Sequence, residues 1–292
     1  DPNQRFAEDK LRLIRAVRFA ARFGYRIEPS THEAIIALAP QISEVSAERI
    51  RDELAKILMG DQPDQGIRLL HQTGLLKMIL PEIVAMEGVQ QPPEFHPEGD
   101  VLIHTLLLLE KMQSPSFELA FGALLHDVGK PPTFAIKDRI RFDKHCEVGS
   151  QMARAVGHRL RFSNQQIEVV AELVKDHLRF KDVRNMRSST LKRFLRNPNF
   201  AEHLELHRLD CLASHGDLSN WEFCKQKLAE LEPEEIRPKR LLTGDDLIEL
   251  GYSPGPQFAK ILTTVEDAQL EGKIKTKEEA FRFAKKEFPL TS

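Results

Sequence analysis

The sequence predicts an all-α protein, and three observations lead to this prediction. Apolar residues recur at helical spacing through nearly every segment, beginning with Phe6, Leu11 and Ile14. Prolines and charges concentrate in two breaks, residues 90–100 and 231–240, which separate the periodic segments into groups. Little suggests β-structure apart from residues 134–142, which are expected to form one short hairpin.

The expected helices fall into three groups. Before the first break they occupy residues 5–23, 31–40, 45–60 and 64–80, with Gly24 and Gly60 as stop signals. Between the breaks they occupy residues 100–113, 116–127, 145–160, 164–178, 188–196, 200–214 and 219–231. After the second break, a small helical module contains a Pro-Gly-Pro turn at 254–256. The predicted domains are therefore a helical neck (1–85), a helical body (86–231) and a small helical tail (232–292).

Composition excludes several classes of protein. The chain has 292 residues, of which 41% are hydrophobic and 29% charged, and no apolar run is long enough for a membrane span. Its three cysteines form no CxxC pair, which indicates a reducing, cytoplasmic setting without zinc ribbons or a disulfide framework. The first residue is Asp and the charged opening is no signal peptide, so we expect part of a longer protein. The net charge of −2 does not demand a nucleic-acid partner.

Polar residues stand at the ends or on the faces of different predicted helices in the body. They are His104, His126, Asp127, His145, His177 and Asp210. In a helical bundle such residues can meet at one point of the core. Imidazole and carboxylate ligands suit a divalent transition metal such as Mn, Fe, Co, Ni or Zn. Six ligands are enough for a two-ion site that activates water and holds a phosphoryl oxygen, which predicts phosphoester hydrolysis.

The alternative is a set of unrelated histidines, each with a local hydrogen bond, and for any single histidine this alternative is favoured. We expect it to apply to His32, His71, His158, His203, His207 and His215, while His96 is either a neighbour of the site or an ordinary loop residue. For the whole set, the adjacent pair His126–Asp127 favours a metal, because buried adjacent charges are costly unless they are paired or metal-bound.

Five segments resemble successive motifs of the HD-domain metal-dependent phosphohydrolases: IHTLLLL, ALLHDVGKP, DKHCEVGS, VKDHL and LDCLAS. The resemblance implies an all-helical domain over residues 86–231. It also implies one or two divalent ions (Mn, Ni, Co, Fe or Mg). The core ligands would be His104, His126, Asp127 and Asp210, and His145 and His177 match the extra histidines of two-metal members. Lys130 resembles the family lysine that faces the substrate phosphate, with a solvent-exposed loop lysine as the alternative.

The first predicted helix also carries a polar pattern. At 100° per residue, Glu8, Asp9 and Arg12 fall within one arc, and Asp9 and Arg12 are i,i+3 neighbours. A carboxylate and a guanidinium held at that separation can read the hydrogen-bonding edge of a base. From physics alone, an amphipathic helix with a salt-bridged polar face is the favoured explanation.

Three segments resemble the class II tRNA nucleotidyltransferases, which are the CCA-adding enzymes and their poly(A) polymerase relatives. They are EDKLRLIRAVRFAARFGYRIEP (8–29), VSAERIRDELAKIL (45–58) and the tail. The resemblance implies that Asp9 and Arg12 of the EDxxR motif select CTP and ATP, with Glu8 in support. It also implies that tRNA is the partner, and that basic residues in 179–196 and 237–240 contact its phosphates; a solvated basic face is the alternative.

One departure from that family stands out. Its catalytic head, with a Gly-Ser turn and an Asp-x-Asp pair, precedes EDxxR, whereas only seven residues precede Glu8 here. We therefore expect no nucleotide addition by this chain alone. The leading hypothesis is the C-terminal part of a tRNA nucleotidyltransferase or poly(A) polymerase whose HD site hydrolyses 2′-phosphates or 2′,3′-cyclic phosphates. The alternatives are a stand-alone HD nucleotidase, and an RNA-binding scaffold with vestigial ligands.

Overall fold

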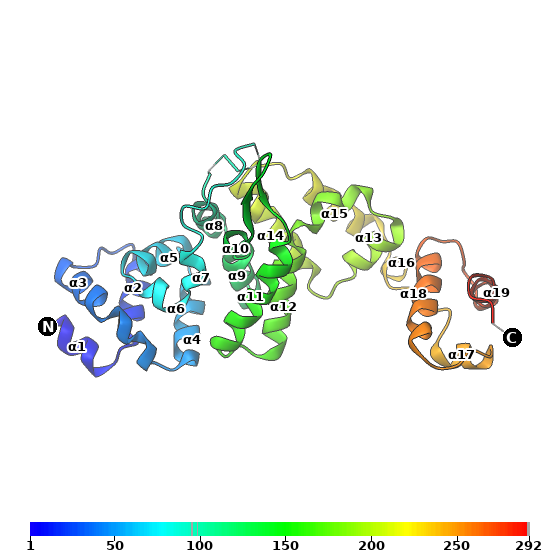
Figure 1. Ribbon diagram of the computed structural model, residues 1–292, viewed down its shortest axis with the longest axis horizontal. Coiled ribbons are helices and arrows are strands. Elements are labelled where there is room, and N and C mark those ends of the chain that lie inside the picture. The colour runs from blue at the N-terminus through cyan, green and yellow to red at the C-terminus, as the bar shows by residue number, and fades with distance from the viewer. Residues whose placement is uncertain (95, 98, 291–292) are drawn as a thin grey trace. The chain divides into compact units, whose positions relative to one another are not determined.

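The computed structural model describes residues 1–94, 96–97 and 99–290 and confirms the all-α class (Figure 1). The predicted hairpin is also confirmed: β1 (Phe134–Ile136) and β2 (Ile140–Phe142) pair antiparallel, with Phe134 opposite Phe142. The chain forms two compact units, one of residues 1–180 with 201–218, the other of residues 181–200 with 219–292. The three-domain division from the sequence stays a prediction.

The first unit begins with the helices of the predicted neck. They are α1 (Pro2–Glu8), α2 (Arg12–Phe23), α3 (Pro29–Leu38), the 3-10 helix η1 (Ala39–Glu44), α4 (Ala47–Leu58), α5 (Pro63–Gln72), α6 (Leu75–Ile79) and α7 (Pro81–Val84). Ser46 caps α4 by accepting a hydrogen bond from the backbone N–H of Arg49, which satisfies one of the free donors of the first turn. The helix therefore starts at Ala47, two residues after the predicted start at residue 45.

Two of the expected helices are interrupted. Residues 5–23 were predicted as one helix, but α1 ends at Glu8, Asp9 is extended and α2 begins at Arg12. The cause is the aspartate, whose Oδ1 accepts a hydrogen bond from the backbone N–H of Leu11 at 3.1 Å and so caps the following helix. Residues 64–80 are likewise split at Gly74, whose φ of +75° lies in the left-handed region that glycine adopts at little cost.

The second half of this unit is a helical bundle. Its helices are α8 (Val101–Glu110), α9 (Phe117–Leu125), α10 (Lys130–Thr133), α11 (His145–Arg159), α12 (Asn164–Asp176) and α14 (Phe200–Ala213), and the 3-10 helix η2 (His177–Asn185) continues from α12. Helices α9 and α11 both pack on α12, and α8 packs on α9. Ser163 and Gln166 form a capping box that starts α12. These contacts fix the helix ends that carry the polar residues of the body.

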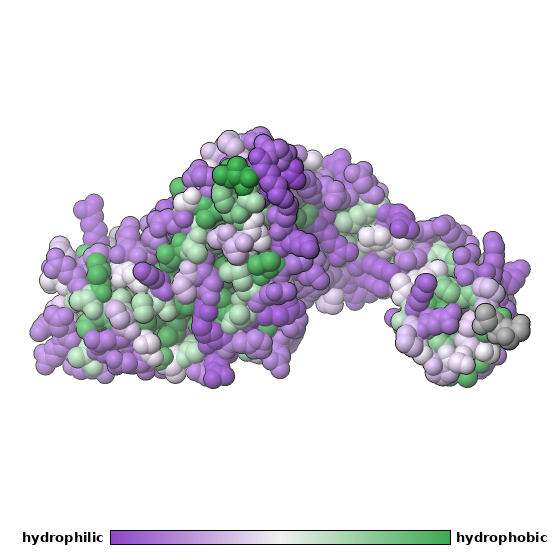
Figure 2. Space-filling model, viewed as in Figure 1, coloured by the Kyte–Doolittle hydropathy of each residue, from purple (hydrophilic) through white to green (hydrophobic). Residues whose placement is uncertain are grey.

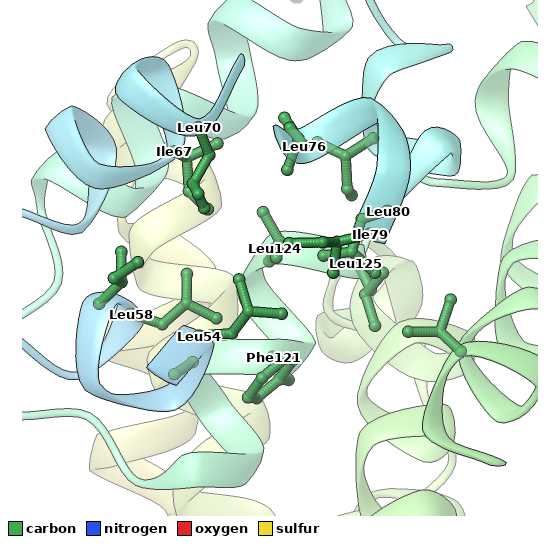
Figure 3. Close-up of a cluster of buried hydrophobic side chains, with 14 of the residues drawn as sticks. Leu54, Leu58, Ile67, Leu70, Leu76, Ile79, Leu80, Phe121, Leu124 and Leu125 are labelled. Carbon is green, nitrogen blue, oxygen red and sulfur yellow. The ribbon is translucent and has the colours of Figure 1, made fainter. Parts of the chain in front are cut away.

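One continuous core joins the neck helices to the bundle (Figure 3). Leu54 and Leu58 of α4 lie beside Phe121 and Leu124 of α9, and all four side chains are buried. Burial of each such side chain contributes about 1.5–3 kcal/mol to folding. Helix α9, which ends at the His126–Asp127 pair, is therefore anchored along its whole length.

Two glycines bring the metal-motif segments together. A Cβ on Gly129 would lie 2.1 Å from the carbonyl oxygen of His145 and 2.6 Å from the backbone nitrogen of Gly149. Only glycine permits this approach, because both obstacles are backbone atoms that cannot move aside. The contact holds the segment after Asp127 against the first turns of α11.

The second unit contains α13 (Ser188–Leu195), α15 (Ser219–Glu230), α16 (Pro233–Ile236), α17 (Gly244–Glu249), α18 (Pro256–Leu270) and α19 (Lys277–Glu287). Leu247, Tyr252 and Ile261 belong to a core that is separate from that of the first unit. The face of the molecule shown in Figure 2 is mainly hydrophilic. None of the helices in the described part of the chain has the length and apolar character that a membrane crossing requires.

Candidate metal centre

The six predicted ligands come together in the first unit. His104 lies in α8, His126 follows the last residue of α9, and His145 is the first residue of α11. His177 follows the last residue of α12, and Asp210 lies in α14. Each side chain thus comes from a different helix or helix end, and Asp127 follows His126 directly. All but Asp210 are buried, and the Asp210 side chain is 18% exposed.

The first group of donor atoms contains His104, His126 and Asp210. The Nε2 atoms of the two histidines are 3.3 Å apart, and Nε2 of His104 lies 3.1 Å from Oδ1 of Asp210. Nε2 of His126 is also 3.2 Å from Oδ2 of Asp127. Metal–ligand bonds of about 2.1 Å require neighbouring donors to lie roughly 3.0–3.4 Å apart. All three distances meet that requirement.

The second group of donor atoms contains Asp127, His145 and His177. Oδ1 of Asp127 lies 3.8 Å from Nε2 of His145 and 3.6 Å from Nε2 of His177. The two carboxylate oxygens of Asp127 therefore face different histidine groups. The donors of this second group lie wider apart than those of the first group.

Backbone carbonyls orient three of the four imidazoles. Nδ1 of His126 lies 2.8 Å from the carbonyl oxygen of Ala123, Nδ1 of His145 lies 2.8 Å from that of Phe142, and Nδ1 of His177 lies 2.7 Å from that of Val174. A carbonyl only accepts hydrogen bonds, so Nδ1 carries the proton and Nε2 keeps its lone pair. This arrangement of outer partners is typical of histidines that bind metals.

Asp127 supplies the strongest test of whether these residues fit an ion. Its Oδ1 is buried and has no hydrogen-bond partner among the described residues. Burial alone would raise the pKa of this carboxyl, but the adjacent His126 and Lys130 hold the pKa well below its usual value, so it is ionised. A buried, ionised and unbonded oxygen is expensive unless a cation binds it. The donor set therefore fits a divalent metal.

Two histidines of the site, His145 and His177, are kept uncharged at neutral pH by burial. Burial lowers the pKa of His177 to about 3, against the opposing effect of Asp127, and burial also lowers the pKa of His145. Burial would raise the pKa of Asp210, but the hydrogen bond from His104 holds it below its usual value. Neutral imidazoles at His145 and His177 and ionised carboxylates at Asp127 and Asp210 are the protonation states that bind metals.

Lys130 is not the exposed loop lysine that was the alternative. It is buried, and its Nζ lies 2.7 Å from Oδ2 of Asp127 and donates a 2.6 Å hydrogen bond to Oε1 of Gln91. The sequence reasoning did not single out Gln91, which lies in the proline-rich break where no motif marked it. Lys130 therefore helps to hold the carboxylate of Asp127 in place.

The histidines outside the predicted set have local surroundings. The ring of His207 stacks on Phe180 with centroids 4.5 Å apart, His71 pairs with Glu87 at 3.3 Å, and His215 accepts a hydrogen bond from the backbone of Asp217. His96 is closest to the site, with its ring edge against that of His104 at 4.9 Å between centroids.

Cys146 was missed as a member of the cluster. Its Sγ lies 3.6 Å from Nε2 of His145 and 3.9 Å from Nδ1 of His177. One donor atom from each of these three residues lies within 4.8 Å of the other two. The signal was present in the sequence, because the cysteine directly follows a predicted ligand at the start of a helix.

The Glu8–Arg12 segment has a different geometry from the one predicted. Because α1 ends at Glu8, the side chains of Asp9 and Arg12 do not share a helix face. Asp9 Oδ2 accepts a 2.8 Å hydrogen bond from Arg49 of α4, whereas Arg12 pairs with Glu8 and donates to the carbonyl of Arg5 at 2.8 Å. Arg49 is thus a further member of this segment that sequence reasoning overlooked.

A separate basic cavity of about 1160 Å³ lies between α2, α4 and the α11–α12 turn. Its described lining includes two carboxylates, Asp52 and Asp61, and five cationic side chains: Arg18, Arg22, Arg51, Lys56 and Arg161. Arg161 has a φ of +58°, an uncommon value for a non-glycine residue, and Arg51 donates a 2.6 Å hydrogen bond to its carbonyl. The cavity lies apart from the six ligands, because none of them lines it.

The basic segment 179–196 is partly neutralised within the second unit. Arg193 and Arg196 of α13 pair with Glu266 of α18 at 2.7 Å and 2.8 Å. Arg193 also pairs with Asp267 at 3.2 Å. These two arginines therefore attach α13 to α18, which leaves fewer charges of this segment for an RNA.

Comparison with known families finds two matches in this chain. Residues 24–86 match the model described as "Probable RNA and SrmB- binding site of polymerase A", and residues 100–214 match the HD domain. The HD range contains all six predicted ligands, whereas Glu8, Asp9 and Arg12 precede the first range.

Curated relatives cover most of the chain. It is 33% identical over 289 residues to the CC-adding tRNA nucleotidyltransferase of Thermus thermophilus, which covers 94% of this chain and 66% of that protein. It is 35% identical over 200 residues to the multifunctional CCA protein of Acinetobacter baumannii, covering 66% of this chain and 48% of that protein. The chain thus spans about half to two thirds of the relatives it matches.

Solved structures share the fold. The Bacillus stearothermophilus CCA-adding enzyme in complex with CTP matches 98% of this chain and 64% of its own, with a TM-score of 0.67 and 20% identity. A CCA-adding enzyme in complex with ATP matches 98% of this chain and 62% of its own, with a TM-score of 0.55 and 18% identity. At these identities the likeness establishes the fold alone.

Proposed function

The chain belongs to the tRNA nucleotidyltransferase and poly(A) polymerase family, and from this premise we propose that it serves tRNA 3′-end processing and that its HD site hydrolyses phosphoesters. The proposed substrates are 2′-phosphomonoesters and 2′,3′-cyclic phosphodiesters, which are the phosphate groups that an RNA 3′ end can carry. A divalent transition metal would be the cofactor.

One observation carries the hydrolase proposal. Asp127 presents a buried, ionised oxygen with no hydrogen-bond partner among the described residues, between two imidazoles whose lone pairs face it. A structural role would leave that oxygen unsatisfied at a cost of about 1–3 kcal/mol or more. A bound cation would interact with that oxygen and so remove the energetic cost. It would also explain why each histidine that donates Nδ1–H to a backbone carbonyl keeps its Nε2 lone pair for the site.

The residues of the chain have distinct parts in this chemistry. His104, His126, Asp127, His145, His177 and Asp210 would hold the metal. Bound divalent ions supply a hydroxide at neutral pH and stabilise negative charge on a phosphoryl oxygen. Lys130 fixes Oδ2 of Asp127, and its charge partly offsets the two carboxylates of the site. The carbonyls of Ala123, Phe142 and Val174 keep the imidazoles in the tautomer that has a free Nε2.

The test combines metal analysis with a panel of phosphoesters. Purified protein is assayed for bound metal and, after addition of Mn²⁺, Ni²⁺ or Co²⁺, for hydrolysis of 2′-AMP, 2′,3′-cyclic AMP, 3′-AMP and 5′-AMP. We expect metal-dependent hydrolysis of the first two, and its loss in His126→Ala. Activity on free 5′-nucleotides without tRNA affinity supports the stand-alone nucleotidase instead. A protein that binds no metal and hydrolyses none of the four is the RNA-binding scaffold.

A second proposal concerns RNA, and the basic cavity favours it. Arg51 and Arg161 are held together by a 2.6 Å hydrogen bond to a backbone carbonyl, although both side chains are cationic. Arg18 and Lys56 pair with Glu53, and Arg51 pairs with Asp52, so part of the positive charge at the cavity is already neutralised. Arg22 and Arg161 add further positive charge to the lining, and an RNA phosphate is an anion that this charge can hold. We assign these residues to contact with the tRNA backbone.

Binding of tRNA at several salt concentrations tests this assignment. Arg161→Ala is expected to weaken binding uniformly across tRNA sequences and to reduce the slope of log affinity against log salt by about 1. Arg139→Ala, an exposed change in the hairpin turn, serves as the control. An unchanged slope in Arg161→Ala would remove the cavity from the RNA interface.

The nucleotide-selecting role of Glu8, Asp9 and Arg12 in an enzyme that includes a catalytic head remains part of the proposal. In such an enzyme CTP and ATP would be the substrates, with Asp9 held by Arg49 and Arg12 held by Glu8. Arg12→Ala is expected to relax the choice between CTP and ATP. An unchanged preference would assign these residues to the structure of the helix break alone.

A further inference from the structure

We propose that Cys146 supplies a thiolate ligand to the metal ion held by His145 and His177, which makes this half of the site selective for borderline transition ions. The inference rests on the proposed metal site and adds to it a donor outside the six-residue set. The ligand class is a divalent ion such as Zn²⁺, Co²⁺ or Ni²⁺, in preference to Mg²⁺, because sulfur donors favour softer cations.

The distances support a shared ion. Bonds of about 2.1 Å to nitrogen and 2.3 Å to sulfur, at a tetrahedral angle, place the two donors about 3.6 Å apart. The observed distance between Sγ of Cys146 and Nε2 of His145 is 3.6 Å. The donor atoms of Cys146, His145 and His177 all lie within 4.8 Å of one another.

The surroundings point to a ligand independently of the cysteine. Oδ1 of Asp127, which lies 3.8 Å and 3.6 Å from Nε2 of His145 and His177, is buried and has no hydrogen-bond partner among the described residues. Cys146 is also the second residue of the 15-residue helix α11. Burial and the nearby Asp127 raise the pKa of the Cys146 thiol to about 12, so the bound ion itself has to displace the proton, as metals do when they bind cysteine.

When the thiol of Cys146 binds the ion, it exchanges its proton for the metal. The S–H bond of Cys146 breaks, the sulfur keeps the electron pair and forms the bond to the divalent ion, and the proton passes to solvent. No oxidant or reductant takes part. Each ion bound at this position therefore releases one more proton from the wild type than from a variant without the thiol.

The prediction can be read without any activity measurement. Metal-stripped full-length chain is titrated with Co²⁺ alone, while near-ultraviolet absorbance and released protons are recorded. We expect two equivalents to bind, with a thiolate-to-cobalt charge-transfer band for one of them. In Cys146→Ser the band disappears, one proton fewer is released, and one equivalent binds at least about tenfold more weakly.

Two other cysteines provide matched controls. Cys211 is buried next to the ligand Asp210, and Cys224 is buried in the other compact unit, so Cys211→Ser and Cys224→Ser should both retain the band. Two equivalents of cobalt bound without a band, or a band that survives Cys146→Ser, overturns the thiolate and leaves the proposed hydrolase intact. Failure of the wild type to bind cobalt at all overturns both.

Discussion

The metal centre and the Glu8–Arg12 segment both gather charged residues, but they satisfy them in opposite ways. In the segment, Asp9 and Arg12 are partly exposed, and their polar contacts are either local, with Arg5 and Glu8, or with Arg49 of one neighbouring helix. In the centre, the donors come from five different helices or helix ends, are nearly all buried, and include an oxygen with no hydrogen-bond partner among the described residues.

The difference separates a structure that is complete in water from one that needs a ligand. Exposed ion pairs contribute about 0–1 kcal/mol, and solvent replaces them when they break. A buried carboxylate oxygen has no such replacement. The same residue types therefore indicate a cap and a surface network at one end of the first unit, and a cation site in its interior.

The largest loss of stability is expected from a change at Gly129, where two backbone segments of the candidate metal centre touch. Gly129→Ala places a Cβ against the carbonyl of His145 and the nitrogen of Gly149, so we expect a loss of at least about 4 kcal/mol in the free energy of unfolding. Urea denaturation measures it, and metal binding should be lost together with stability. Gly255→Ala, where nothing lies within 4 Å, is the control; similar unfolding of the two variants would contradict the close approach.

Next in size is the effect of removing the charge of Asp127 without changing the shape of the side chain. Asp127→Asn keeps the volume but removes the anion that faces both histidine groups, so hydrolysis should fall at least about 100-fold and metal content should drop. Asp143→Asn changes an exposed carboxylate in the motif segment that contains His145 and should leave both unchanged. Equal metal content in the two variants would mean that Asp127 only holds Lys130.

The third prediction tests how burial alone, at a histidine outside the predicted ligand set, affects the stability of the protein. His207 is buried against Phe180, and burial lowers its pKa to about 4, below the unfolded value of 6.5. The unfolded chain therefore binds the extra proton first, so stability is present above pH 6.5 and is lost as pH falls toward 4, by about 1.4 kcal/mol per pH unit. Urea unfolding across this pH range should show that the free energy of unfolding falls less steeply with decreasing pH in His207→Gln than in the wild type.

The exposed His215 provides the matched comparison, since it accepts a hydrogen bond from the backbone of Asp217 near the surface. His215→Gln should leave this pH dependence unchanged. If His207→Gln behaves like His215→Gln, burial of a neutral histidine is not what sets the acid sensitivity of the bundle.

The sequence predicted which residues gather at this site, because that depends on their spacing along the chain. It missed the contacts that form only when distant segments pack against one another. The six residues that come together could be selected from the sequence because each stands at a helix end or on a helix face within a recognisable motif; their role as ligands stays a prediction. The orphaned oxygen of Asp127, the contact of Lys130 with Gln91 and the proximity of Cys146 depend on how helices from distant segments meet. The break at Asp9 was missed because apolar periodicity runs through it, while the capping bond that interrupts the helix involves a single side chain.

The smallest loss of stability is expected from changes to the exposed contacts of the Glu8–Arg12 segment. Arg49→Ala removes the partner of Asp9, whose pKa is held below its usual value chiefly by that hydrogen bond, yet the pair is about half exposed on the arginine side. We expect a loss of no more than about 1 kcal/mol in the free energy of unfolding, which shrinks further in high salt because exposed pairs are screened. Asp9→Ala should cost somewhat more than Arg49→Ala, because it also removes the bond that caps α2. A loss above about 3 kcal/mol for Arg49→Ala, the range of a broken buried pair, would erase the distinction between the two regions.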